Sequence, residues 1–180
     1  EDLKPAVLEV EARCVRPAWL AGDKLRASVE GWYLFGAPMS GNRADWTLRL
    51  NSAHYEPPGM EGFSFGREFR GEQLDRLAGS GGLDLDPKGK AAVEVQLDKV
   101  YSGSGNALRA SLEAGVTDPE RQRLFGRASA WVHRANLYFG VKASGGFADA
   151  GKPWSAEIAA VRPDGSPAAG LSGEGRMVKR

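Results

Sequence analysis

The chain has 180 residues, of which 42% are hydrophobic and 26% charged, and its formal net charge is +1. This composition is typical of a folded globular protein and excludes a disordered polypeptide and a transmembrane helix, which needs about 20 consecutive apolar residues. Basic residues are interspersed with acidic ones, so a nucleic-acid-binding surface is not expected either.

Alternation of apolar and polar residues is the dominant pattern along the chain. A period of two indicates strands that bury one face and expose the other. The 24 glycines and 10 prolines are typical of short strands joined by tight turns. Alternation is found in residues 8–14, 24–33, 45–50, 93–97, 108–114 and 124–133. Two antiparallel sheets stacked on such faces form a sandwich, so the sequence predicts an all-β fold.

Two segments between these predicted strands suggest a helix and a turn instead of a strand. Residues 67–78 could supply one or two turns of helix, with Leu74 and Leu77 on the apolar side together with Phe69. The segment 84–89 resembles the start of a calcium loop, but it lacks the ligands required at the fifth and twelfth positions. A turn leading into the next strand is predicted there, and a second turn is predicted at residues 163–166.

An internal repeat suggests how the chain is divided. Residues 21–41 (AGDKLRASVEGWYLFGAPMSG) align without a gap with residues 150–170 (AGKPWSAEIAAVRPDGSPAAG), at an offset of 129 residues. The identities fall at turn positions, where glycine reaches positive φ and proline ends a strand. The repeat predicts a complete sandwich domain over residues 1–136. Residues 137–180 would then form the first, incomplete part of a second copy.

No residue carries a catalytic signal. Cys14 is the only cysteine and falls on an inward face, so a buried, inert thiol is expected. His54 and His133 lack ligand spacing and are expected at the surface or in turns. We therefore predict no catalytic residue, no metal site and no cofactor, and the chain is not expected to be an enzyme.

Exposed aromatic residues are the remaining candidates for a site. Strand parity places Trp32 and Trp131 on outward faces. An outward tryptophan can mark an interface with another domain or a partner. The alternative is that the connection over residues 51–80 covers these rings, and the sequence does not decide between the two.

The segments Leu20–Leu25 (LAGDKL) and Gly31–Pro38 (GWYLFGAP) resemble macroglobulin-like domains of the α2-macroglobulin family, in particular its bacterial members. The turn at 86–89 leading into AAVEVQL is similar to the strand-launching turn of these domains. The resemblance implies a large periplasmic protease trap, in which a bait segment is cleaved and the shell rearranges. Some members carry a Cys-x-Glu-Gln thioester, but Cys14 is followed by Val15, Arg16 and Pro17.

The resemblance therefore implies a structural scaffold fragment of a broad-spectrum protease inhibitor. Its partners would be neighbouring macroglobulin domains and, through the parent protein, target proteases. Any lipid anchor in the inner membrane would belong to the parent, and a signal peptide would lie well upstream of this segment. The alternative is an immunoglobulin-like repeat of a surface adhesin or other secreted binding protein. An accessory domain of a secreted hydrolase is a third, weaker interpretation.

Overall fold

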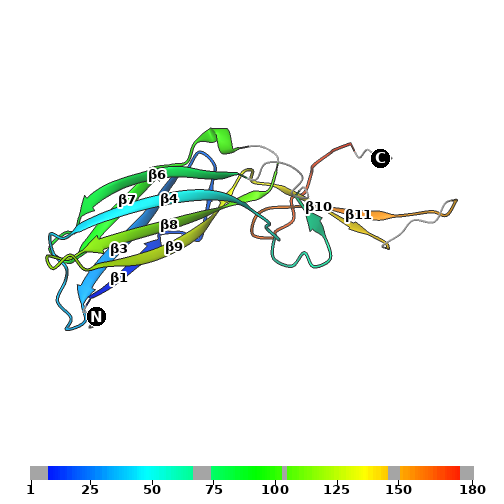
Figure 1. Cartoon of the computed structure of the whole chain (residues 1–180). Helices are drawn as coiled ribbons and strands as arrows, with labels where there is room; N and C mark the ends of the chain where they lie inside the picture. Colours follow the sequence, from blue (N-terminus) through cyan, green and yellow to red (C-terminus); the bar gives the residue numbers. More distant parts are fainter. Residues whose placement is uncertain (1–7, 67–73, 103–104, 146–150, 175–180) are drawn as a thin grey trace.

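The computed structural model describes residues 8–66, 74–102, 105–145 and 151–174. Its main body is made of two stacked β-sheets, and a long hairpin projects from one end of that body (Figure 1). No helix in the described ranges is long and apolar enough to span a membrane.

The smaller sheet of the sandwich contains three antiparallel strands. Strand β3 (Lys24–Tyr33) lies in the centre, between β1 (Leu8–Cys14) and β7 (Lys90–Gln96). The alternation predicted for these segments is confirmed, because Leu25 and Val29 on the inner face of β3 are completely buried. The polar residues between them remain on the solvent side.

The larger sheet contains five strands in the order β2-β9-β8-β4-β6. The pair β2 and β9 is parallel and the other pairs are antiparallel. The strands are β2 (Ala18–Leu20), β9 (Arg123–His133), β8 (Ala107–Thr117), β4 (Arg43–Ala53) and β6 (Asp75–Asp84).

The hydrophobic core lies between the two sheets. Leu48, Leu112 and Val132 face it from the larger sheet and are at most 1% exposed. Each large apolar side chain buried in this way contributes roughly 1.5–3 kcal/mol. Along one side of the sandwich, β9 of the larger sheet and β1 of the smaller sheet are in backbone contact. A Cβ at Gly126 of β9 would lie 2.8 Å from the Ala12 nitrogen of β1.

Strand β6 corrects the helix predicted over residues 67–78. Residues 75–78 belong to β6, residues 75–77 pair with β4, and Leu77 is half exposed. Phe69 lies outside the described residues. The glycines of β6 explain why the strand has no visible alternation: the ring of Trp46 lies where side chains of Gly79 and Gly81 would be, 3.2–3.3 Å from their ideal Cβ positions.

The predicted turns are confirmed. Asp86 Oδ1 accepts hydrogen bonds from the backbone nitrogens of Lys88 in the turn (2.8 Å) and of Lys90, the first residue of β7 (2.9 Å). Gly89 adopts the positive φ of 75° that this turn requires. A short 3₁₀ turn, η1 (Lys99–Tyr101), follows β7 and is capped by Asp98.

The projecting hairpin belongs to a third sheet. It consists of β10 (Tyr138–Ala143) and β11 (Ala156–Val161), and β10 also pairs with the short strand β5 (Ser64–Phe65). Its register reproduces that of β1 and β3. Glu9 pairs with Trp32 in the sandwich, and Tyr138 pairs with Val161 in the hairpin, each 129 residues further on. The two segments of the sequence repeat therefore form two hairpins of the same design.

Candidate interaction surfaces

The outer face of the five-stranded sheet carries charged and small polar side chains around the middle of β4, β8 and β9. A shallow depression of about 410 Å³ lies on it, lined by residues such as Thr47 and Ser111. The charged residues at its rim are paired, since Arg127 lies 2.7 Å from Glu113. Within the described ranges, no three His, Cys, Asp or Glu side chains come together in a way that could hold a metal ion.

The cysteine and the two histidines, which were considered above as candidate reactive groups, can now be located in the structure. Cys14, expected to be buried, is half buried against the core, and this burial raises the pKa of its thiol. His54 is exposed, with its Nε2 3.2 Å from Glu56. The surface or turn prediction is wrong for His133, which is 3% exposed at the end of strand β9.

His133 belongs to an aromatic cluster between the sandwich and the projecting hairpin. Its Nδ1 lies 2.7 Å from the hydroxyl of Tyr138, which is 9% exposed. The ring of Tyr55 packs edge-on against His133, with centroids 4.7 Å apart. Burial lowers the pKa of His133 and raises those of Tyr55 and Tyr138, because each loses hydration of its charged form. All three side chains are therefore held neutral at pH 7.

The turn that follows β11 contacts the sandwich through the loop that follows β4. The hydroxyl of Tyr55 donates a hydrogen bond of 2.7 Å to the carbonyl of Pro163. The turn also brings Gly165 against the carbonyl of Pro58, leaving no room for a Cβ. A groove of about 280 Å³ opens beside this contact, where the guanidinium of Arg16 lies 3.8 Å above the Trp19 ring.

The two tryptophans proposed as interface residues lie in different places. Trp131 is half buried at the same junction, with the Tyr55 ring 4.9 Å away and the Arg109 guanidinium 4.8 Å from its centroid. Its contact with Tyr55 comes from the connection over residues 51–80. Trp32 is half buried at the end of β3 and forms an isolated bridge with Pro38. A partner interface at either residue stays a prediction.

Two exposed apolar surfaces were not predicted from the sequence. One is the turn after β3, where Leu34 is 64% exposed and Phe35 is 78% exposed. The other is one face of the projecting hairpin, which carries Phe139, Val141 and Ile158 in solvent. A residue-by-residue comparison of the two copies would have indicated that the two hairpins bury different faces, because Tyr138 stands where the first copy has the charged residue Glu9.

The described residues thus form a two-sheet β-sandwich with a repeated hairpin and exposed apolar ends. The chain belongs to the bacterial α2-macroglobulin family, since residues 8–122 match the model of the bacterial alpha-2-macroglobulin MG5 domain. The expected family and the expected β-sandwich are thus confirmed.

Individual relatives agree with this assignment. The chain is 28% identical over 170 residues to an alpha-2-macroglobulin homolog of Nostoc sp., covering 91% of this chain and 9% of that protein. It is 25% identical over 142 residues to alpha-2-macroglobulin of Escherichia coli, covering 79% of this chain and 8% of that protein. The chain therefore spans less than a tenth of the length of the relatives it matches.

Solved structures show the same fold. The cryo-EM structure of native E. coli alpha-2-macroglobulin aligns with a TM-score of 0.67 at 22% identity, covering 92% of this chain and 11% of the other. A Salmonella alpha-2-macroglobulin mutant aligns with a TM-score of 0.68 at 20% identity, covering 93% of this chain and 12% of the other.

Proposed function

We propose that this chain is a structural scaffold unit of a bacterial α2-macroglobulin-like protease inhibitor and performs no catalytic step itself. The observation that carries the proposal is the match of residues 8–122 to the MG5 domain of that family. Structures of the E. coli homologue activated by trypsin and by porcine elastase support proteases as the targets of the whole protein.

The chain would supply one complete sandwich over residues 1–136 and the start of a second over residues 137–180. The shared register of the two hairpins supports this division. The exposed face of β10 and β11 corresponds to the face of β1 and β3 that packs on the core, so the remainder of the second sandwich would cover it. The parent protein would work outside the cytoplasm, where rigid domains shift as bodies after cleavage.

An inhibition assay tests the scaffold role. The isolated chain is expected to leave cleavage of a protein substrate by trypsin or elastase unchanged, because no reactive or bait segment is assigned to it. Digestion of the chain followed by mass spectrometry is expected to show no preferred cleavage site in the sandwich. Inhibition by the isolated chain at micromolar concentration would contradict a purely structural role.

The sequence of the parent protein provides a second test. A Cys-x-Glu-Gln motif, or a bait segment that proteases cut before they are trapped, would support the protease trap. A parent built only of further 129-residue copies and a cell-wall anchor would instead point to a surface adhesin.

A further inference from the structure

The turn that follows β3 has the same backbone as the turn that follows β11. In the first turn, the Gly36 nitrogen donates to the Tyr33 carbonyl over 2.8 Å, and Gly36 has a φ of 93°. In the second, the Gly165 nitrogen donates to the Arg162 carbonyl over 2.9 Å, and Gly165 has a φ of 83°. Each glycine lies 129 residues from its counterpart, so the two turns present equivalent surfaces.

The second turn is covered by another part of the protein. The Tyr55 hydroxyl binds the Pro163 carbonyl, and the Pro58 carbonyl closes against Gly165. Val161, at the base of this turn, is 2% exposed and packs in a small core with Tyr138. A proline-containing segment of the loop that follows β4 therefore covers the turn that follows β11.

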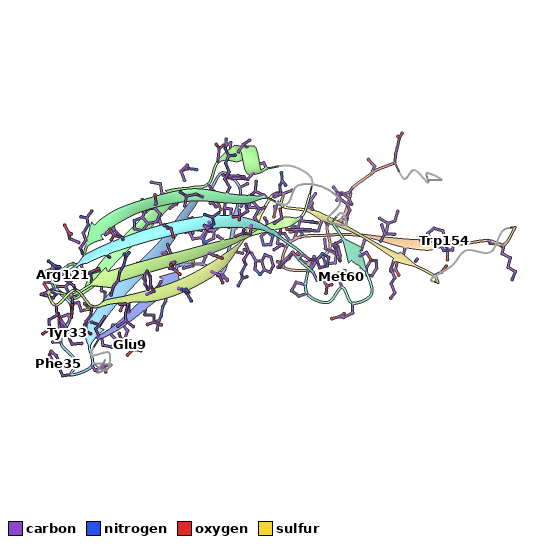
Figure 2. All side chains as sticks on the ribbon, viewed as in Figure 1. Glu9, Tyr33, Phe35, Met60, Arg121 and Trp154 are labelled. Carbon is purple, nitrogen blue, oxygen red and sulfur yellow. The ribbon has the colours of Figure 1, made fainter. Side chains whose placement is uncertain are left out.

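The equivalent surface on the first hairpin is open. Leu34 and Phe35 occupy the positions of Pro163 and Asp164 and are 64% and 78% exposed. Apart from Gly36 itself and its two chain neighbours, no described atom lies within 4 Å of a Cβ built on Gly36. Figure 2 shows Tyr33 and Phe35 at the end of the sandwich that lies opposite the projecting hairpin.

The exposed ring is held in place before any partner arrives. Tyr33 and Phe35 stack with centroids 5.2 Å apart and an interplanar angle of 9°. A side chain fixed in its bound orientation loses less conformational entropy on association, which favours docking. Large apolar groups concentrated in one exposed turn are also typical of interaction sites.

We propose that the turn formed by residues 32–36 is the docking surface for the end of a neighbouring β-sandwich domain. The covering segment would lie across Leu34, Phe35 and Gly36 as residues 55–58 lie across residues 163–165. It would meet Glu9 where the second hairpin has Tyr138, so a basic or other hydrogen-bond-donating side chain is expected at that point. This docking surface presupposes the proposed function, because it requires a second sandwich domain in the parent protein.

Thiol accessibility tests the proposal. Phe35→Cys and the control Val100→Cys, which replaces a residue 63% exposed in η1, are made in a Cys14→Ala background. In the 180-residue chain both thiols are expected to react with Ellman's reagent at similar rates. In the full-length parent, the thiol at position 35 is expected to react about tenfold or more slowly, while the control is unchanged. Equal reactivity at position 35 in both proteins would overturn the proposal.

A cross-link identifies the occupant. A photoactivatable maleimide on Phe35→Cys in the full-length parent is expected to attach to an extended loop of another sandwich domain in the same polypeptide. Attachment to a second molecule or to an added protease would overturn the assigned occupant. Amide hydrogen exchange of the unmodified turn, compared between the short chain and the parent, provides the same test without substitution.

The two proposals fail separately. Protection of position 35 in a parent that does not inhibit trypsin or elastase would refute the protease-inhibitor function and leave the docking surface standing. Inhibition by a parent in which position 35 stays fully reactive would refute the docking surface and leave the protease-inhibitor function standing.

Discussion

The hairpins β1–β3 and β10–β11 share a register and a turn but have opposite surroundings. The first buries the face that carries Val29 under the larger sheet and exposes the face that carries Glu9. The second exposes Ile158, the counterpart of Val29, and buries Tyr138, the counterpart of Glu9. The difference teaches that local alternation and turn chemistry determine the shape of such a hairpin, whereas the neighbouring elements determine which face is buried.

The largest expected difference between the hairpins comes from truncating the equivalent residues Val29 and Ile158 to alanine. Val29→Ala is expected to lower the free energy of unfolding by about 2–3 kcal/mol, because two buried methyl groups are lost and a cavity remains. Ile158→Ala, at the equivalent position, is expected to change it by less than about 0.5 kcal/mol. Urea denaturation of the 180-residue chain followed by circular dichroism measures both values. Similar losses in the two variants would show that the second hairpin is packed as well as the first.

A smaller effect is expected from pH at the junction of the two units. The folded-state pKa of His133 is lowered by burial, so the unfolded state binds a proton first as the pH falls. Stability is therefore fully present above about pH 6.5 and is expected to fall below it, by no more than about 1.4 kcal/mol per pH unit. Denaturation between pH 7.5 and 5.5 measures this slope. His133→Gln should remove it and the control His54→Gln should retain it; a slope that survives in His133→Gln would contradict the assignment.

The smallest effect concerns the paired turn glycines. Gly36→Ala and Gly165→Ala should each cost about 1 kcal/mol locally, because alanine is strained at positive φ. Gly165→Ala is additionally expected to separate the turn from Pro58, since a Cβ there has no room. Hydrogen exchange should therefore accelerate in β10, β11 and the loop at 54–60 for Gly165→Ala. For Gly36→Ala, β1 and β3 should stay protected, and equal acceleration in both hairpins would show that the contact with Pro58 is unimportant.

The sequence predicts most of the sandwich because its central strands alternate clearly and its turns contain the residues that such turns require. The edge strand β6 could not be predicted, since Gly79 and Gly81 leave one face without side chains and its pairing with β4 depends on residues more than 20 positions away. The cluster of Tyr55, His133 and Tyr138 was missed for a related reason. These residues meet only through the packing of the hairpin on the sandwich, which no local pattern encodes.

The glycines of β6 also bear on how this domain can change during evolution. The indole of Trp46 lies over Gly79 and Gly81, 3.2–3.3 Å from their ideal Cβ positions, so the ring would have to shift by a few tenths of an ångström to admit a side chain at either position. A smaller residue at position 46 would in turn leave a hollow over two bare stretches of backbone. The three positions are therefore expected to tolerate substitution together better than one at a time, because bulk added on one strand has to be removed from the other.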